Sequence, residues 1–217
     1  MNLKEPFVIT VSRQIGSGGH TVGRILAEKL NTLYFDKYLI ESLEKKFNLT
    51  VCGIEKLKGE KKNWLADFIQ FIAPIPSAKT LGVDPLYTQE FRMDVTTDDI
   101  YKAETEILKE LANEGSCVIA GRSGFFVFKD HPNHLNVLII APDENRIRRV
   151  MKKQGLAEET AKALIKDIDQ KRDNYIQRYT GTSRYDARNY DLVLNADGHT
   201  EEELVAIILS YIQDCPQ

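Results

Sequence analysis

The chain has 217 residues, of which 42% are hydrophobic and 28% are charged, an ordinary composition for a globular protein. This length suits one α/β domain that carries an insertion. The net charge of -3 and the isoelectric point near 5.9 argue against bulk binding of nucleic acid, which usually needs a basic domain. No apolar run approaches the length of a membrane span, and the N-terminal residues lack a signal-peptide pattern. With three widely spaced cysteines, we expect a reduced, cytoplasmic protein that binds no membrane.

The first predicted elements are a strand, a glycine-rich turn and a helix. The β-branched run at 7–12 lies between Pro6 and the glycines, and it predicts a buried strand. Apolar residues at helical spacing predict a helix over 19–30. A short strand is expected at 32–36, and a helix with one apolar side at 37–47.

The stretch 48–96 is less regular than the segments on either side of it. Residues 63–74 have a helical pattern that ends at Pro74, and residues 75–85 are rich in proline, glycine and small polar residues typical of loops. We therefore interpret 48–96 as a helical insertion, either a lid or a subdomain on the acceptor side of a site.

The second half of the chain alternates strands with helices. The patterns predict helices over 98–115, 143–154 and 157–179, strands over 117–121, 134–141 and 190–197, and a C-terminal helix opened by a capping box at Thr200 and Glu203. Such alternation is typical of a parallel sheet covered on both faces, in which ligands bind beyond the carboxyl ends of the strands. The glycine-rich turn lies at such an end.

The turn after the first strand has the composition of a phosphate-binding loop. Gly16, Gly18 and Gly19 leave room for backbone N–H groups to converge on an anion, and the N-terminus of the following helix attracts negative charge. Ser17 can add a hydroxyl donor. The alternative is a tight turn without a ligand, which glycine-rich strand-to-helix connections also make.

The loop departs from the usual pattern G-x-x-x-x-G-K-[ST] because no alignment of it contains a lysine. If Gly18 is the second glycine, Arg13 stands at the first glycine, Gly19 at the lysine and His20 at the Ser/Thr position. Arg13 is the nearest cation that could supply the missing charge, and we expect it to stand in for the lysine.

Two other alignments of the loop remain open. A shift by one residue places His20 at the lysine position and Thr21 at the magnesium-ligand position. A third alignment runs from Gly18 to Gly23 with Arg24 in place of lysine, but it would extend the loop deep into the predicted helix.

Arginines are concentrated in one part of this acidic chain. Seven of the eleven fall between 146 and 188, and they are Arg146, Arg148, Arg149, Arg172, Arg178, Arg184 and Arg188. Because the guanidinium group binds phosphate oxygens in pairs, this cluster is a candidate for binding phosphate groups. We expect Arg146 or Arg149, and Arg184 or Arg188, to reach phosphates. The alternative is that many of them are solvated helix charges.

Three segments resemble the cytidylate kinase-like family, a branch of the P-loop nucleoside monophosphate kinases. They are "ITVSRQIGSGGHTVGRILAEKLNTLYFDKYLI" near the N-terminus, "GSCVIAGRSG" at 115–124 and "YDLVLNAD" at 190–197. The resemblance covers most of the chain, with 48–96 the least similar part. It implies a single domain over 1–217 with the three-layer P-loop NTPase fold and a five-stranded parallel sheet. It also implies that 48–96 is the acceptor-binding helical insertion and that 143–188 is an arginine-rich lid.

The resemblance also implies an activity and its site residues. The activity is transfer of the γ-phosphoryl group of ATP, with Mg²⁺, to a nucleoside monophosphate or a similar small acceptor. The donor phosphate loop would comprise Arg13, Gly16, Ser17, Gly18, Gly19, His20 and Thr21. The acceptor would meet Asp36, Arg122, Asp186 and Arg188, and the expected catalytic cations are Arg13, Arg122, Arg146, Arg149, Arg184 and Arg188.

The sequence also departs from the better-known cytidylate kinases. The aspartates that flank the Gly-Arg pair in those enzymes are Ala120 and Ser123 here, and Asp36 is followed by Lys37 and Tyr38. Together with the missing lysine, these departures leave a second hypothesis, a non-catalytic sensor that binds a nucleotide or another anion on the same fold. We expect a small-molecule nucleotide partner and no nucleic acid.

Overall fold

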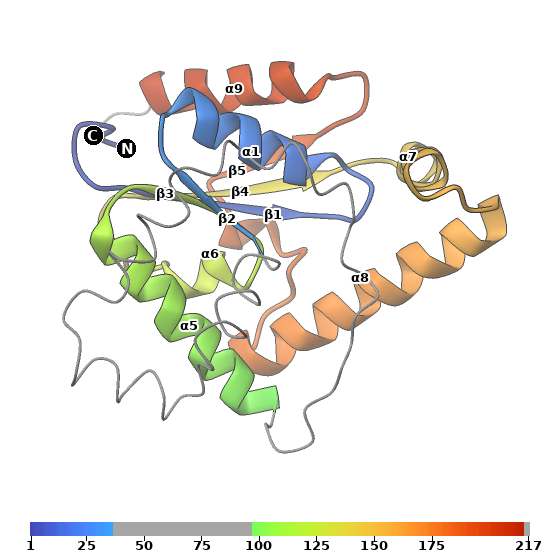
Figure 1. Cartoon of the computed structure of the whole chain (residues 1–217), viewed down its shortest axis with the longest axis horizontal. Helices are drawn as coiled ribbons and strands as arrows, with labels where there is room; N and C mark the ends of the chain where they lie inside the picture. The colour runs from blue at the N-terminus through green and yellow to red at the C-terminus, as the bar shows by residue number, and fades with distance from the viewer. Residues whose placement is uncertain (37–96, 215–217) are drawn as a thin grey trace. The chain divides into compact units, whose positions relative to one another are not determined.

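The computed structural model describes residues 1–36 and 97–214 of the chain (Figure 1). The chain divides into two compact units, residues 1–36 with 115–217, and residues 37–114. In the second unit, the described element is helix α5, Thr97–Glu114. The helices predicted over 37–47 and 63–74, and the insertion predicted over 48–96, lie outside the described residues.

The first unit is built on a five-stranded parallel sheet, as predicted. The strands are β1 (Val8–Arg13), β2 (Leu33–Phe35), β3 (Cys117–Ala120), β4 (His134–Ile140) and β5 (Leu192–Asn195). Their order across the sheet is β2-β3-β1-β4-β5. β1 lies at the centre, with Val8 beside both Cys117 of β3 and His134 of β4. The glycine-rich loop therefore leaves the sheet at its middle, where the strand order changes direction.

Helices occupy the connections where periodicity predicted them. They are α1 (Gly19–Lys29), α6 (Gly124–Val127), α7 (Asp143–Gln154), α8 (Glu158–Thr180), the 3-10 turn η1 (Ala187–Asn189) and α9 (Glu201–Asp214). Periodicity did not predict α6 and η1, because a single turn is too short to display it. None of the helices in the described part of the chain is long and apolar enough to span a bilayer.

Two layers of helices cover the sheet. Helices α1 and α9 lie on one face, while α6 and α8 lie on the other (Figure 1). The core between the sheet and the first helical layer contains Ile9, Val137, Leu26 and Ile208, each fully buried. On the other face, α6 packs directly on β1. The chain thus has the three-layer α/β architecture that the alternating pattern predicted.

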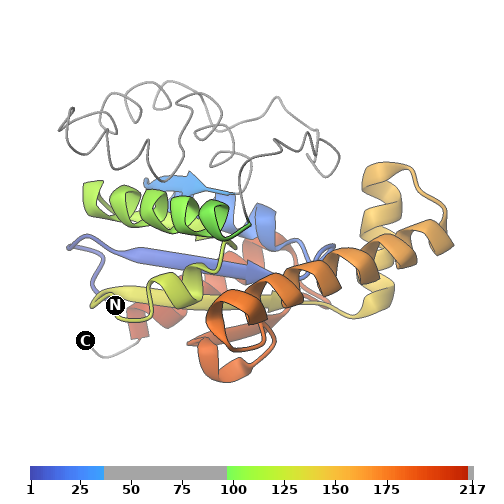
Figure 2. The same ribbon diagram turned by 90° about the horizontal axis from the view of Figure 1, so that it is seen from below.

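The segment 143–188, predicted as a lid, forms α7, α8 and the loop that follows them. The C-terminal end of α8 lies beneath the sheet, and its N-terminal end lies beside α7 (Figure 2). Both helices end at glycines in the left-handed conformation, Gly155 with φ 66° and Gly181 with φ 70°.

The predicted capping box at the start of α9 is confirmed. The Thr200 hydroxyl accepts a bond from the Glu203 N–H at 3.2 Å, and the Glu203 carboxylate accepts one from the Thr200 N–H at 2.8 Å. These bonds lower the pKa of Glu203, since the backbone donor favours the charged carboxylate.

We predict that Thr200→Ala destabilises the protein by about 1 kcal/mol, because it removes the oxygen that caps α9. Urea unfolding followed by circular dichroism measures this loss. Ser210→Ala, on the exposed side of the same helix, serves as the control and should change stability by less than about 0.5 kcal/mol. Equal effects of the two substitutions would contradict the capping role.

Candidate functional site

The loop between β1 and α1 has a backbone that only small residues permit. Gly16 and Gly18 have φ of 79° and 85°, in the left-handed region. A side chain at Gly16 would also lie 2.7 Å from the backbone oxygen of Arg146. Helix α1 begins at Gly19, and its first turn carries no acidic side chain. The loop and helix end therefore present N–H groups and a positive dipole, the arrangement that binds phosphate.

Hydrogen bonds inside the loop hold its shape. The Ser17 side chain is 1% exposed, and its hydroxyl donates to the Gln14 carbonyl at 2.9 Å. The Gln14 side chain accepts from the Ala141 N–H at 3.0 Å, beyond the end of β4. The hydroxyl expected to reach phosphate is thus used within the loop, and Gln14, which the motif did not single out, fastens the loop to the sheet.

Arg146 lies beneath the loop and is 3% exposed. Its Nε donates to the Ile15 carbonyl at 2.8 Å, its Nη1 to Asp143 at 2.8 Å, and its Nη2 to Asp169 of α8. The alternative of a solvated helix charge is therefore wrong for this residue. Its contact with phosphate stays a prediction, and the geometry makes it a positioning residue that joins the loop to α7 and α8.

Arg149, one turn later on α7, contacts the loop at Gly18. Its Nη1 occupies the space that a side chain at Gly18 would need, and it pairs with Glu201 at the start of α9. The Arg149 side chain is 41% exposed. A cation at this place can meet both solvent and a phosphate held by the loop.

Arg184 also supports the loop, at the point where β1 ends. It is 6% exposed, and its Nη2 donates to the carbonyl of Arg13, the last residue of β1. Asp173 of α8 fixes this segment by accepting from the Ser183 hydroxyl at 2.9 Å and from the Arg184 N–H at 3.2 Å. Arg184 thus contacts the main chain where the strand becomes the loop, as a positioning residue.

The predicted Gly-Arg pair ends β3 in an unusual turn. Gly121, Arg122 and Ser123 have φ of 78°, 55° and 56°, so three consecutive residues adopt the left-handed conformation. Such conformations cost about 1–3 kcal/mol for a residue with a side chain and gather at functional sites. The guanidinium of Arg13 lies against Gly121. The two sequence signatures therefore meet at the carboxyl ends of neighbouring strands.

His20 and Asp36 come together at the start of α1. Nε2 of His20 lies 2.9 Å from a carboxylate oxygen of Asp36, and the two side chains are 52% and 19% exposed. Tyr34 packs edge-on against the His20 ring at a centroid distance of 5.6 Å. Burial raises the pKa of Tyr34, and the nearby charge of Arg13 opposes that rise. Tyr34 lies in the segment that resembles the family, but the sequence analysis did not assign it to the site.

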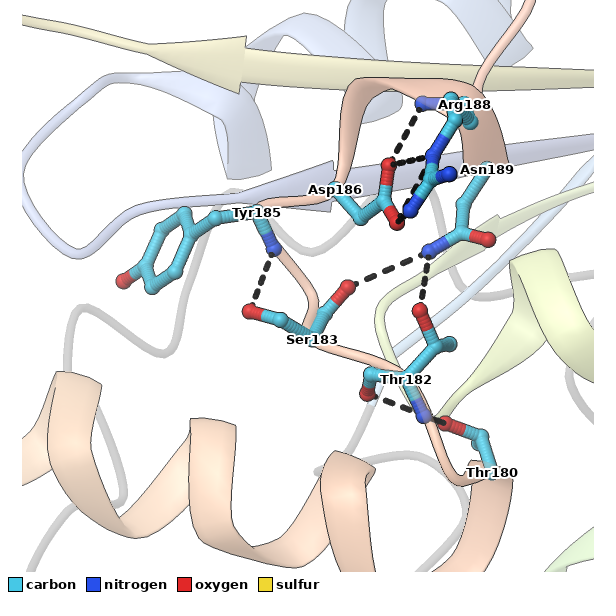
Figure 3. Close-up of polar contacts among 7 residues, drawn as sticks. All are labelled: Thr180, Thr182, Ser183, Tyr185, Asp186, Arg188 and Asn189. Carbon is cyan, nitrogen blue, oxygen red and sulfur yellow. Dashed lines mark hydrogen bonds and ion pairs between the residues drawn. The ribbon is translucent and has the colours of Figure 1, made fainter.

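Asp186 and Arg188 face each other in the loop before β5 (Figure 3). The Asp186 carboxylate accepts from Nη2 of Arg188 at 2.6 Å and from its backbone N–H at 3.0 Å. These bonds lower the pKa of Asp186 to about 2, with the side-chain bond the larger cause. The Asn189 amide donates to Thr182 and Ser183, which closes the loop on itself. The Arg188 side chain is 89% exposed, so its guanidinium faces solvent.

The described residues therefore place the predicted side chains in three different settings. Arg13 and Arg149 lie against the loop glycines, Arg146 and Arg184 are buried beneath the loop, and Arg188 is exposed. Within residues 1–36 and 97–214, no group of three or more His, Cys, Asp or Glu side chains could hold a metal ion.

Comparison with known proteins identifies the family. The family model for the cytidylate kinase-like family matches residues 8–198. This chain belongs to the cytidylate kinase-like family. A cytidylate kinase from Sulfolobus acidocaldarius is 23% identical to it over 205 residues, which cover 94% of this chain and 93% of that enzyme.

Solved structures share the fold of this cytidylate kinase-like protein. A structure described as an uncharacterized protein from Eubacterium ventriosum has a TM-score of 0.69 at 22% identity, covering 96% of this chain and 99% of that one. Shikimate kinase from Bacteroides thetaiotaomicron has a TM-score of 0.50 at 16% identity, with 96% and 99% covered. At these identities the likeness shows the fold, the α/β three-layer architecture of P-loop kinases.

We predict that Arg146→Ala in this cytidylate kinase-like protein costs about 3–5 kcal/mol, because it leaves Asp169 and the Ile15 carbonyl without their buried partner. Chemical denaturation measures the loss. Arg148→Ala, an exposed arginine on the same helix, is the matched control and should cost less than about 0.5 kcal/mol. The double change Arg146→Met with Asp169→Leu should recover part of the loss. A loss no larger than that of the control would refute the positioning role.

We also predict that Arg188→Ala raises the pKa of Asp186 above its value of about 2. The pKa should stay below that of an ordinary aspartate, because the backbone N–H of residue 188 still donates. The pair stabilises the native state above the ordinary aspartate pKa, and this contribution is lost as the pH falls toward 2. Carbon-detected NMR titration of Asp186 measures the shift, with Arg178→Ala as control. An unchanged midpoint would assign the low pKa to another group.

Proposed function

We propose that the protein is an ATP-dependent phosphotransferase that transfers the γ-phosphoryl group of ATP to a nucleoside monophosphate or a similar small acceptor. Membership of the cytidylate kinase-like family and the P-loop kinase fold support this proposal. One observation carries it for this chain. The glycine loop leads into a helix start without acidic side chains. The guanidinium group of Arg149 lies against Gly18 of the loop, and the Arg13 side chain runs from beside Gly19 of the loop to Gly121 at the end of β3.

The donor side follows from this geometry. The polyphosphate of ATP would lie on the N–H groups of the loop and of the first turn of α1, while Mg²⁺ enters with the nucleotide as part of the substrate. Arg149 can approach the phosphates from α7, because it is partly exposed and lies over Gly18. Phosphoryl transfer requires alignment and neutralisation of the charge that spreads over the transferred group, which these donors supply.

The acceptor side is proposed at the carboxyl ends of β2 and β3. Asp36 and His20 lie at the first of these ends, and the left-handed turn with Arg122 lies at the second. An acceptor oxygen placed here attacks the γ-phosphorus, the bond from that phosphorus to the bridging oxygen breaks, and ADP leaves. The exposed Arg188 can also approach a phosphate of the acceptor, because its bonds to the Asp186 side chain use Nε and Nη2.

A non-catalytic nucleotide sensor is the second candidate function. It is favoured by the substitution of Ala120 and Ser123 for the two motif aspartates. It is also consistent with Arg146 and Arg184, whose nitrogens donate to protein oxygens rather than to solvent. A sensor needs the loop to bind an anion and needs no acceptor site.

We predict that a coupled ADP-release assay with ATP–Mg²⁺ detects turnover with at least one member of an acceptor panel. The panel contains the nucleoside monophosphates and small hydroxylated acids such as shikimate. Arg122→Ala should lower kcat/KM by at least about 10-fold, the loss expected for one charge-assisted contact to a phosphate.

Arg148→Ala is the matched control for this assay, since Arg148 is exposed on α7 and lies outside the proposed site. Isothermal titration with ATP runs in parallel. Suppose that the native chain binds ATP but turns over no acceptor of the panel, and that Arg122→Ala leaves the Kd for ATP unchanged. This result would support the sensor and reject the transferase for those acceptors.

A further inference from the structure

Two positions of the loop depart together from the usual pattern. With Gly18 as the second glycine of G-x-x-x-x-G-K-[ST], the first glycine is replaced by Arg13 and the lysine is replaced by Gly19. One position gains a cationic side chain, and the other loses one. Sequence spacing alone leaves these as two separate changes, six residues apart in the chain.

In the structure, the two positions share one space. A Cβ built on Gly19 would lie 2.5 Å from the Cβ of Arg13 and 3.2 Å from its Cγ, whereas real Cβ atoms do not approach other atoms closer than 3.0 Å. The atoms it would meet are the base of a side chain fixed to the end of β1, not a movable tip. Because the nearest collision is with the Cβ of residue 13, the arginine there excludes any side chain at 19, and a lysine at 19 requires glycine at 13.

The main chain of Arg13 is held firmly, so this exclusion cannot be relieved by a shift of the strand. Arg13 pairs with Ile139 across β1 and β4, and its carbonyl accepts from the buried Arg184. From this fixed base, its side chain runs past the start of α1 to Gly121, at the end of β3. A side chain at Gly121 would collide with the Arg13 Nη1. The guanidinium thus lies between the phosphate loop and the turn that carries Arg122.

We propose that Arg13 and Gly19 are a reciprocal exchange of the glycine and the lysine of the ordinary loop. The phosphate-binding cation is supplied from the end of β1 instead of the first turn of α1, and position 19 is glycine because Arg13 fills its side-chain space. This inference rests on the proposed function, because it assigns the cation that meets the donor phosphates. It further places that cation beside Gly121, on the side where the phosphoryl group is transferred.

Arginine suits the longer path from the strand. Its planar fork donates two parallel bonds to a phosphate, whereas the ammonium group of lysine acts as a point charge. The charge of Arg13 is felt at the Tyr34 hydroxyl, for which it is the largest opposing influence on a raised pKa. The guanidinium is therefore near the carboxyl end of the sheet, where ligands bind in this class of fold.

The experiment measures binding of ATP and of inorganic tripolyphosphate to the full chain by isothermal titration, with a thermal melt of every variant. Arg13→Gly should raise the Kd for both ligands by about 10- to 100-fold, the effect of losing a charged hydrogen-bond donor. Gly19→Lys alone should lower the melting temperature and weaken binding, because its Cβ collides with Arg13. The double variant Arg13→Gly with Gly19→Lys should regain the melting temperature and bind ATP at least 10-fold more tightly than Arg13→Gly.

Two further variants keep the test decisive if glycine at 13 disturbs the fold. Arg13→Gln retains the Cβ and most of the length but loses the charge, so it should bind as weakly as Arg13→Gly. Arg13→Lys retains the charge and should bind within a few-fold of the native chain. Arg148→Ala, at an exposed position of α7, is the control for the loss of one positive charge and should leave both Kd values unchanged.

The outcomes separate this inference from the proposed function. Native-like binding by Arg13→Gln would overturn the role of Arg13. A folded double variant that binds no better than Arg13→Gly would overturn the exchange. If the native chain transfers phosphate in either case, the proposed function stands while this inference fails. Failure of the native chain to bind ATP and tripolyphosphate would overturn both.

Discussion

The glycine loop keeps its shape because a buried guanidinium group supports it from below. Arg146 joins the Ile15 carbonyl to Asp143 of α7 and to Asp169 of α8. The left-handed backbone at Gly16 and Gly18 is held by the bonds of Ser17 within the loop and, from outside the loop, by this contact of Arg146. The same bonds fix where α7 begins relative to the loop, and hence where Arg149 lies. The bonds of Arg146 therefore fix the shape of the loop and the position of α7 together.

Much of the fold could be predicted from the sequence, because most strands and helices of the described region are long enough for the spacing of their apolar residues to identify them. The β1–loop–α1 unit, the parallel sheet implied by alternation and the capping box at Thr200 were predicted from local patterns in the sequence. The turn at Gly121 could not be predicted in this way. Its left-handed backbone at Arg122 and Ser123 depends on packing that no spacing pattern records.

The location of the candidate site was predicted better than the roles of the individual arginines in it. The sequence grouped Arg146, Arg149, Arg184 and Arg188 because they are near one another in the chain. Their tasks differ because the partners come from elsewhere: the carbonyls of Ile15 and Arg13 for two of them, and Glu201 for a third. Such partners lie 52 to 171 residues away, and composition carries no signal of them. Gln14 escaped sequence analysis for the same reason, because its partner Ala141 is 127 residues away.

The burial of each arginine decides whether it can change partner when a phosphate arrives. Breaking a buried pair leaves an uncompensated charge and costs several kcal/mol, so Arg146 and Arg184 stay with the protein. An ion pair at the surface contributes only about 0–1 kcal/mol to stability. A phosphate with two negative charges can therefore displace the carboxylate partner of an exposed arginine. Arg149 is partly exposed and pairs with the single charge of Glu201 over Gly18. In the proposed site, that carboxylate neutralises Arg149 while no phosphate is bound, and the partial exposure of the pair lets Arg149 exchange Glu201 for the phosphate of a nucleotide.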